Sequence, residues 1–314
     1  MAEITEIECL VPSGDACGEG IVWSADDQTV YWTDINRFLI HRHSVQTRAT
    51  RSWMFEEPVV AVSLTTEPGR LLVALGSKLI WWWPETDRRS DHGFVLPGSP
   101  AVRLNDGRAD HLGNFWIGSM RNNVLPDGEL GEAGGSDGIL FRVSPEGHVT
   151  EWMHGIGISN TVCLSPDHRT FYTADTCANE IYAFDFDCSD ASLANKRLFH
   201  GGFSRGAPDG SVVDSEGYLW NCRFFGRSIV RFAPDGSVDR VIEMPVKNIT
   251  TATFGGPDLK TLFVTSASVL RDPGDRLAGS LWALRTSVAG LPENRVIAPP
   301  KVADAERLVS AKAS

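Results

Sequence analysis

Four side chains with carboxylate or amide oxygens occur at matching places in this chain, each 11 or 12 residues before the centre of a short aromatic segment. They are Glu19, Asn105, Asn160 and Asp209. Oxygen ligands that converge without Cys or His indicate a hard cation, with Ca²⁺, Mg²⁺ or Mn²⁺ favoured. Zinc also accepts carboxylates and stays an alternative. The spacing therefore predicts a divalent metal site, provided that the fold brings these positions together.

The aromatic segments belong to a repeat that runs through the chain. Its markers are Tyr31, Leu72, Trp116, Tyr172, Trp220 and Phe263. They are separated by 41, 44, 56, 48 and 43 residues, and periods of this size are typical of propellers and other repeat arrays. Counting back from Leu72 and Phe263 gives Val60 and Thr251, which break the pattern of metal-binding side chains. The six markers predict six structural repeats.

Each repeat contains short runs of apolar, aromatic and β-branched residues that are separated by Gly, Pro, Asp or Asn. Such runs predict strands, and Pro and Gly favour the turns between them because Pro presets φ and Gly tolerates positive φ. About four strands fit into each repeat, which describes a propeller blade, whereas no helical periodicity supports an α/β barrel. The sequence therefore predicts an all-β, six-bladed β-propeller with four antiparallel strands per blade.

The first strand of each blade in such a propeller lines a central channel, so that equivalent strand starts meet at one end of the channel. The polar residues would converge there and place the metal at the channel mouth. We expect residues 1–300 to form this single domain, with Ile4 to Val11 as the outer strand that closes the last blade. We expect Asn122 to Gly138 to form a loop on the top or rim, and residues 301–314 to form a tail.

The composition argues against several classes of function. The chain has 314 residues and a net charge of −11, which disfavours a nucleic-acid groove and suits a soluble acidic protein that binds a cation. No apolar run approaches the roughly 18–20 residues of a membrane span. The acidic N-terminus lacks the features of a signal peptide, and the six cysteines show no CxxC pair. We expect a cytoplasmic monomer or small homo-oligomer with no nucleic-acid or membrane partner.

Short motifs surround the polar residues and follow one another along the chain. They are Cys17–Trp23, Arg103–Gly107, Gly118–Met120, Gly157–Asn160, Pro208–Gly210 and Phe254–Asp258. In sequence and in order they resemble the motifs of the SMP-30/gluconolactonase family, the regucalcin-like sugar lactonases, over nearly the whole chain. The resemblance implies a six-bladed propeller with one divalent ion (Ca²⁺, Mn²⁺, Mg²⁺ or Zn²⁺) at the channel mouth.

The resemblance also implies roles for single residues. By motif position, Glu19, Asn160 and Asp209 would bind the metal, and Arg103 and Asn105 would contact the substrate. The implied reaction is metal-dependent hydrolysis of a sugar (aldono-) lactone to its sugar acid, a step of carbohydrate catabolism. Asp209 would act on the attacking water as a general base. A carboxylate shared with a cation loses proton affinity, so the sequence leaves open whether Asp209 is base, ligand or both.

The chain departs from the family pattern at two notable places, and the second bears on the substrate. Thr161 follows the Ser-Asn pair where the family often has Gly. Some members carry an acidic residue that touches substrate shortly after the Gly-Thr/Ser-Met motif, whereas this chain reads Arg121–Asn123 there. We therefore hypothesise that Arg121 contacts an anionic group of the substrate, such as a carboxylate or sulfonate. Alternatively, Arg121 is a solvated loop residue or pairs with Asp127 or Glu129.

Other functions remain open for a propeller of this kind. A propeller arylesterase or phosphotriesterase is the nearest enzymatic alternative, because similar metals at a channel mouth serve ester chemistry. A non-catalytic propeller that binds calcium or a partner protein is an alternative of another class, since one fold hosts many functions. The combination of Glu19, Asn160 and Asp209 with Arg103 favours a site that processes small polar molecules, such as a sugar lactone.

Overall fold

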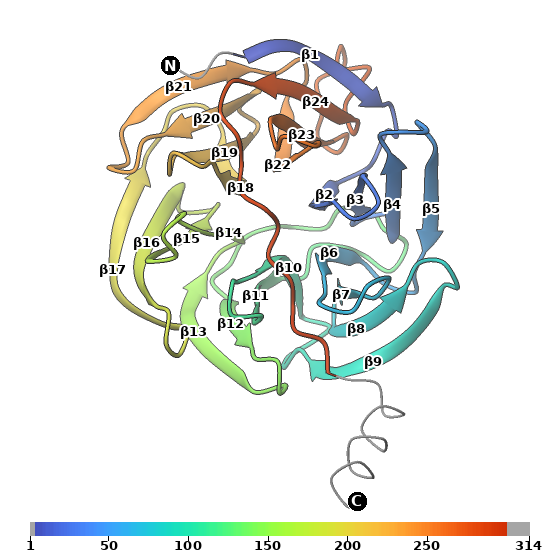
Figure 1. The fold of residues 1–314 in the computed structure, drawn as a ribbon, viewed down its shortest axis with the longest axis vertical. Coiled ribbons are helices and arrows are strands. Elements are labelled where there is room, and N and C mark those ends of the chain that lie inside the picture. Colours follow the sequence, from blue (N-terminus) through green and yellow to red (C-terminus); the bar gives the residue numbers. More distant parts are fainter. Residues whose placement is uncertain (1–3, 300–314) are drawn as a thin grey trace, which may run out of the picture.

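The structure is a computed structural model, which describes residues 4–299. These residues form 24 strands in six four-stranded antiparallel sheets, and the sheets are arranged radially around a central axis (Figure 1). This confirms the predicted all-β, six-bladed propeller. Within the described range, no helix is long and apolar enough to cross a membrane.

Each blade is a meander whose first strand lies nearest the axis. Blades one to three consist of β2 (Gly18–Ser24), β3 (Thr29–Asp34), β4 (Leu39–Ser44) and β5 (Thr50–Met54); β6 (Val59–Leu64), β7 (Leu71–Leu75), β8 (Lys78–Trp83) and β9 (Arg88–Val95); and β10 (Val102–Ala109), β11 (Phe115–Arg121), β12 (Gly138–Val143) and β13 (Val149–Ile156). Blades four to six consist of β14 (Ser159–Leu164), β15 (Thr170–Asp175), β16 (Glu180–Asp187) and β17 (Ser192–Gly201); β18 (Ala207–Val213), β19 (Leu219–Phe224), β20 (Ser228–Phe232) and β21 (Val238–Glu243); and β22 (Asn248–Gly255), β23 (Thr261–Ala267), β24 (Leu281–Thr286) and β1 (Ile4–Val11). The outer strand β1 therefore pairs with β24 and joins the N-terminal segment to the last blade.

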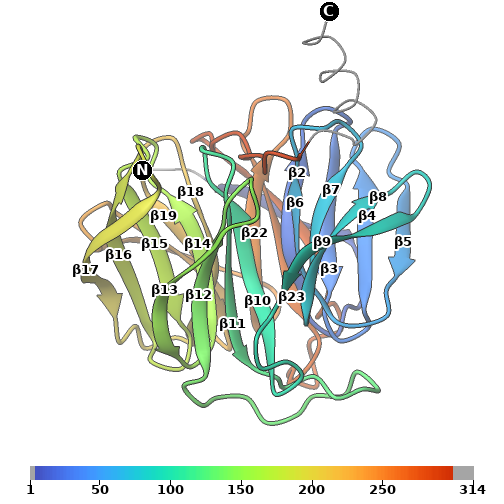
Figure 2. The ribbon, with the colours of Figure 1, turned by 90° about the horizontal axis from the view of Figure 1, so that it is seen from below.

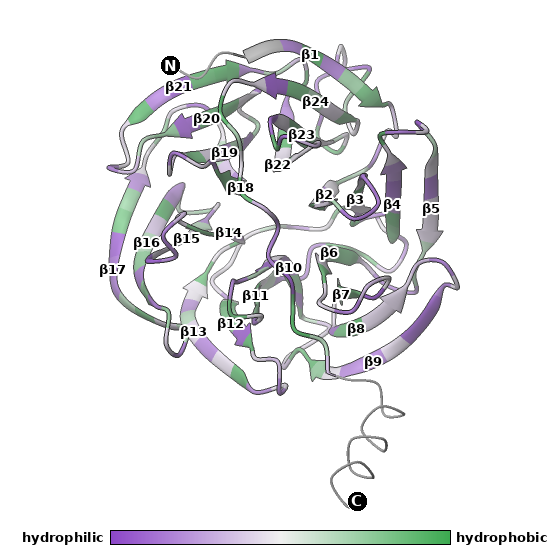
Figure 3. Cartoon of the chain, in the orientation of Figure 1, coloured by the Kyte–Doolittle hydropathy of each residue, from purple (hydrophilic) through white to green (hydrophobic). Residues whose placement is uncertain are grey.

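The strand sequences follow from the layers that they occupy. All residues of the inner strands β2, β6, β14 and β22 are buried, whereas the outer strand β13 is mostly exposed or half-buried. The outer strands accordingly mix polar and apolar residues (Figure 3). The cores lie between neighbouring blades. Successive side chains of β8 point to opposite faces, so Trp82 packs in the core shared with blade one and Trp81 in the core shared with blade three.

Every inner strand carries a register shift at nearly the same place. The shifts lie between Glu19 and Val22, Val59 and Ala61, Leu104 and Gly107, Asn160 and Cys163, Pro208 and Ser211, and Ile249 and Ala252. At each shift the inner strand has one residue more than its partner strand, which is the pattern of a β-bulge. A bulge bends a strand and re-aims its side chains, often beside an active site. The repeat therefore sets the backbone geometry of the channel as well as its strand count.

Strand pairing also shows which residues are equivalent between blades. Each marker residue pairs with one residue on the inner strand of its own blade. Three positions before that inner-strand residue, the six blades have Glu19, Val60, Asn105, Asn160, Asp209 and Thr250. Five of these six agree with the predicted set, but the equivalent in blade six is Thr250 rather than Thr251. The reason is that Thr253, which pairs with Phe263, lies ten residues before it, whereas Cys163 lies nine residues before Tyr172.

The two ends of the channel are covered differently. We call the end where the inner strands begin the mouth. There the predicted loop, residues 122–137, connects β11 to β12. The loop reaches blade one, where Asn36 Nδ2 donates a hydrogen bond to Gly128 O (2.8 Å). We call residues 287–299 the strap; it crosses the opposite end near the axis (Figure 1). Bridges from Val296 to Thr65 and from Gly290 to Asp214 attach the strap to the ends of inner strands. Figure 2 shows the loop and the strap on opposite sides of the propeller. The predicted tail, residues 301–314, lies outside the described residues.

Candidate active site

Three predicted metal ligands converge at the mouth from three different blades. Glu19, Asn160 and Asp209 lie on β2, β14 and β18, and their exposed fractions are 6%, 4% and 6%. The carboxyl groups of Glu19 and Asp209 share a hydrogen bond. Asn160 donates from Nδ2 to Thr176 Oγ1 (2.8 Å), which donates in turn to Pro208 O (2.7 Å). The bulged strand starts therefore bring residues that are far apart in sequence to one place.

Burial and nearby negative charge both raise the pKa values of the carboxyl pair Glu19 and Asp209. Burial, followed by the negative charge of Asp106, raises the pKa of Glu19 to about 8. Burial, followed by the charges of Glu19 and Asp106, holds the pKa of Asp209 well above its ordinary value. A buried carboxyl pair of this kind keeps a proton at neutral pH unless a cation neutralises it.

The donor chemistry of this pair fits a hard divalent cation. The side chains of Glu19, Asp209 and Asn160 offer only oxygen donors toward the site, because Asn160 directs its nitrogen to Thr176. Within residues 4–299, no group of three His, Cys, Asp or Glu side chains is arranged to hold a metal. The proposed ligand set is of another kind, since its third donor is the amide oxygen of Asn160. Carboxylate and amide oxygens are the ligands that Ca²⁺ and similar ions prefer.

Arg103 enters the same site from β10, with only 6% of its surface exposed. Its Nε and Nη2 donate to Asn123 Oδ1 (3.1 and 2.8 Å), and its Nη1 donates to Leu104 O (2.9 Å) and Asn105 Oδ1 (2.6 Å). All of these acceptors are neutral. Burial lowers the pKa of Arg103 to about 10, and the carboxyl groups of Glu19 and Asp209 oppose this effect.

Asn105 connects this arginine to the metal-ligand candidates. Its Oδ1 accepts from Arg103, and its Nδ2 donates to Ser159 O (2.8 Å) and to Asn160 Oδ1 (3.2 Å). Both the oxygen and the nitrogen of the Asn105 amide therefore form hydrogen bonds within the protein. Arg103, Asn105 and Asn160 form one hydrogen-bonded group.

Arg121 is the predicted site residue that the structure does not join to this group. It pairs with Val102 across β10 and β11, next to the pair formed by Arg103 and Met120, so its side chain leaves the opposite face of the sheet. Half of the side chain is exposed, and it forms an ion pair with Asp137 (2.9 Å) rather than with Asp127 or Glu129. Its contact with substrate stays a prediction.

Three residues of the site were not assigned a role from the sequence. Asn123 is 8% exposed and holds two nitrogens of Arg103. Asp106 accepts hydrogen bonds from the backbone N–H groups of Thr161 and Val162, which belong to the next blade. Thr176 orients the amide of Asn160. Only Asp106 had a sequence signal, because it belongs to the Asn-Asp-Gly motif; the other two lie in turns or loops.

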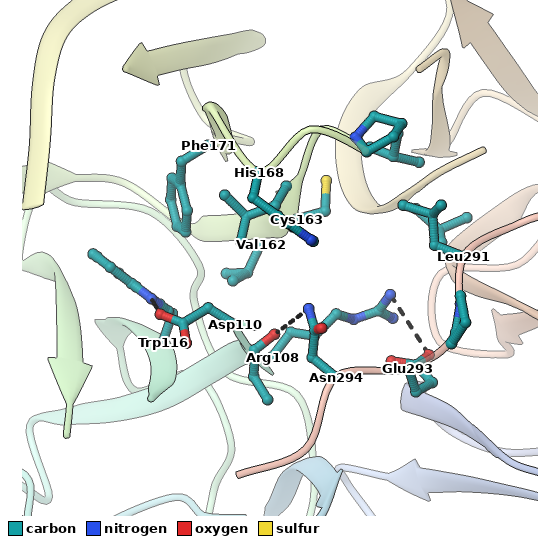
Figure 4. A pocket seen from close by; sticks show the side chains of 16 residues that line it. Arg108, Asp110, Trp116, Val162, Cys163, His168, Phe171, Leu291, Glu293 and Asn294 are labelled. Atoms are coloured by element: carbon teal, nitrogen blue, oxygen red, sulfur yellow. Dashed lines mark hydrogen bonds and ion pairs between the residues drawn. The ribbon is translucent and has the colours of Figure 1, made fainter. Parts of the chain in front are cut away.

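A cavity of about 300 Å³ lies at the strap end of the channel (Figure 4). Arg108 points across it toward Glu293 of the strap, with an N–O distance of 3.8 Å, and Asn294 Nδ2 donates to Ala109 O (3.3 Å). Burial lowers the pKa of Arg108, yet the carboxylates of Glu293 and Asp106 outweigh burial and keep it above its ordinary value. The positive charge here is therefore neutralised by the protein itself.

Known proteins resemble this chain over most of its length. A family model described as the SMP-30/Gluconolactonase/LRE-like region matches residues 17–268. The chain is 32% identical to pentonolactonase XacC of Haloferax volcanii, covering 91% of this chain and 96% of that protein. It is 31% identical to a 6-deoxy-6-sulfogluconolactonase of Pseudomonas putida, covering 91% and 97%. The solved structure of regucalcin from Agrobacterium tumefaciens, a calcium-binding protein, superimposes with a TM-score of 0.84 at 27% identity, covering 92% and 96%.

Proposed function

The chain belongs to the SMP-30/gluconolactonase/LRE-like family, and from that premise we propose that it is a lactonase that hydrolyses a sugar lactone with the help of one divalent metal ion. The observation that carries the proposal is the buried carboxyl pair of Glu19 and Asp209, which shares a hydrogen bond beside Asn160 and Arg103. Relatives named as a pentonolactonase and a 6-deoxy-6-sulfogluconolactonase support the substrate class.

Glu19, Asn160 and Asp209 would hold the metal ion. When bound there, a divalent ion supplies Lewis acidity, which polarises a lactone carbonyl and stabilises negative charge on its oxygen. Asp209 takes a proton from the attacking water as a general base. Its backbone is fixed on two sides, since Asp209 O accepts from Thr161 Oγ1 (2.6 Å) and Asn221 Nδ2 (3.2 Å). The carboxylate is therefore held in place before substrate arrives.

Arg103 orients the lactone. Asn123 accepts from two of its nitrogens and fixes the plane of the guanidinium, which is a rigid fork of donors. No carboxylate of the described residues forms an ion pair with Arg103, so its charge is available to electron-rich oxygens of the substrate. Asn105 holds the Nη1 side of the same guanidinium, at 2.6 Å, and contributes the second predicted substrate contact.

The wider role of the protein follows from this chemistry. Ring opening of an aldonolactone yields a sugar acid, and we assign the reaction to carbohydrate catabolism. The metal is Ca²⁺, Mn²⁺, Mg²⁺ or Zn²⁺, as predicted from the ligand types. The cytoplasmic location and the monomeric or small homo-oligomeric state stay predictions from the sequence.

A second candidate function is cation binding without catalysis. The acidic pair Glu19 and Asp209 favours it, and so does the similarity to a regucalcin that is described as a calcium-binding protein. Arg103 distinguishes the two functions, because a site that only stores a cation gains nothing from a buried positive charge beside it. We therefore favour the lactonase.

Hydrolysis of a panel of aldonolactones, followed with a pH indicator, tests the proposal. The purified protein is treated with chelator, and Ca²⁺, Mn²⁺, Mg²⁺ or Zn²⁺ is then added back to separate samples. We expect turnover of at least one lactone that is lost with chelator and restored by a metal. Absence of metal-restored turnover on every lactone would contradict the proposal, and saturable cation binding in that case would favour the second function.

A further inference from the structure

Thr161 has a backbone conformation that β-branched residues avoid. Its φ is +59°, in the left-handed region, and its side chain is fully buried. Among the described non-glycine residues with positive φ, Thr161 is the only β-branched one. The branched Cβ makes this conformation a genuine outlier, and residues held in such conformations concentrate at functional sites.

The equivalent positions in two other blades hold glycine. Gly20 follows Glu19 with φ +55°, and Gly210 follows Asp209. Both glycines lie against the next blade: a Cβ at Gly20 would lie 2.9 Å from Ala61 Cα, and a Cβ at Gly210 would lie 2.1 Å from Thr251 Oγ1. Glycine would satisfy the backbone at position 161 without strain. The threonine side chain must therefore offset the strain through its contacts.

The contacts of Thr161 connect three blades. Its backbone N–H donates to the carboxylate of Asp106 on β10. Its Oγ1 donates to Asp209 O on β18 (2.6 Å) and accepts from Ser211 Oγ (2.8 Å). The residue directly before it is Asn160. Thr161 therefore lies between two candidate ligands and is hydrogen-bonded to the backbone of the second.

We propose that Thr161 is a positioning residue that fixes Asn160 and Asp209 relative to each other and so preorganises the cation site. The proposal rests on the proposed function in one respect, namely that these two residues are ligands. A glycine would keep the backbone path but would remove one of the two side chains that donate to Asp209 O, leaving Asn221 Nδ2. The strained threonine is thus retained for its hydroxyl group.

Three variants separate the hydroxyl from the strain. Thr161→Gly removes both, Thr161→Ser keeps the hydroxyl, and Thr161→Val keeps the branched Cβ without the hydroxyl. The dissociation constant of Ca²⁺ or Mn²⁺, whichever binds the wild type more tightly, is measured by competition with a chromophoric chelator. The melting temperature is measured separately in excess chelator.

We expect Thr161→Gly to weaken metal binding about 10- to 100-fold, as is typical for residues that orient ligands. In chelator, its melting temperature is expected to equal or exceed that of the wild type, because the strained φ is relieved. A residue that only supported the fold would not combine these two effects. Thr161→Ser is expected to bind metal nearly as tightly as the wild type. Thr161→Val is expected to lose both metal affinity and thermal stability.

Thr65→Val is the matched control at the strap end. Thr65 is also buried and donates from Oγ1 to a backbone carbonyl, that of Arg70 (2.7 Å). This variant is expected to melt at a lower temperature with unchanged metal affinity. The proposal is overturned if Thr161→Gly binds metal like the wild type, if Thr161→Ser is as weak as Thr161→Gly, or if the wild type binds neither ion. A result in which metal affinity follows the hydroxyl while no lactone is hydrolysed would sustain the positioning role and refute the lactonase.

Discussion

The mouth and the strap end of the channel are built from the same six inner strands, yet they treat buried charge in opposite ways. At the mouth, the carboxyls of Glu19 and Asp209 interact with each other, and the acidic Asp106 raises the pKa of both further. At the strap end, Arg108 lies between the carboxylates of Glu293 and Asp106 and is neutralised by them. The negative charge at the mouth is left for a ligand to neutralise, whereas the positive charge at the strap end is neutralised by groups of the protein.

The contrast shows how to locate chemistry in a symmetrical fold. A cavity of about 300 Å³ lies at the strap end, but its charged groups have partners within the protein. Clusters of groups with strongly perturbed pKa values are candidates for functional sites. By that criterion we propose the mouth, rather than the strap end, as the active site.

Replacing Asp209 should show the largest difference in activity between a change at the mouth and a change at the strap end. We expect Asp209→Asn to lower kcat/KM on the preferred lactone by about 10²- to 10⁴-fold, the range for loss of a general base. In chelator, the variant should be at least as stable as the wild type, because one of two repelling carboxyls is gone. Steady-state kinetics and thermal melts measure the two effects. Full activity in Asp209→Asn would remove its assigned role.

The second largest effect should be a dependence of stability on pH that originates at the mouth and not at the strap end. The raised pKa of Glu19, about 8, means that the folded protein without metal binds more protons than the unfolded chain between about pH 4.5 and pH 8. The free energy of unfolding in chelator should therefore fall as pH rises through this window, by on the order of a few kcal/mol. Denaturant melts at several pH values measure it. Glu19→Gln should flatten the slope, and a slope that persists in this variant would place its origin elsewhere.

Replacing Glu293 tests the strap end. We expect Glu293→Gln to lower the free energy of unfolding by about 1–3 kcal/mol, somewhat less than for a tight buried ion pair, because its distance to Arg108 is long at 3.8 Å. Turnover per folded molecule should change by less than about twofold, since nothing at the mouth is removed. Urea melts and kcat measure both quantities. A loss of turnover as large as that of Asp209→Asn would end the distinction between the two ends.

Arg121 should give the smallest effect on stability. It forms an exposed ion pair with Asp137, so Arg121→Ala should change the free energy of unfolding by less than about 1 kcal/mol. If Arg121 recognises an anionic substrate group, kcat/KM should fall for acidic lactones and not for neutral ones. Asp137→Ala, which frees Arg121, serves as the matched variant and should favour acidic lactones. Equal losses on both substrate classes, or no loss, would dismiss the idea.

The fold followed from the sequence because it depends on a regular repeat. Counting back from the markers identified Glu19, Asn105, Asn160 and Asp209 as equivalent positions on the inner strands. The choice of Glu19, Asn160 and Asp209 as metal ligands came from the family resemblance and stays a prediction. The same count missed Thr250 by one residue, because Phe263 lies ten residues after its strand partner Thr253, whereas the other five markers lie eight or nine residues after theirs. Local counting works where this spacing stays nearly constant and fails where it differs.

Other features could not be predicted, since they depend on tertiary contacts. Asn123 lies beyond the end of β11, and its contact with Arg103 depends on the course of the loop. Glu293 follows the last strand of the repeat, and the sequence carries no sign that its segment crosses the axis. The positive φ of Thr161 was likewise hidden, although the replacement of the family's usual glycine by threonine marks the position in the sequence.

The pairing of β1 with β24 has a consequence for biosynthesis. Ile4–Val11 emerges from the ribosome well before its partner Leu281–Thr286, which lies far later in the chain. The nascent chain must therefore keep an unpaired strand edge until that partner has been made, and such edges are prone to misassembly. Ring closure brings together residues almost the whole chain apart, a contact whose loop-closure entropy slows folding. We expect this final pairing to be the step at which chaperones act on the protein.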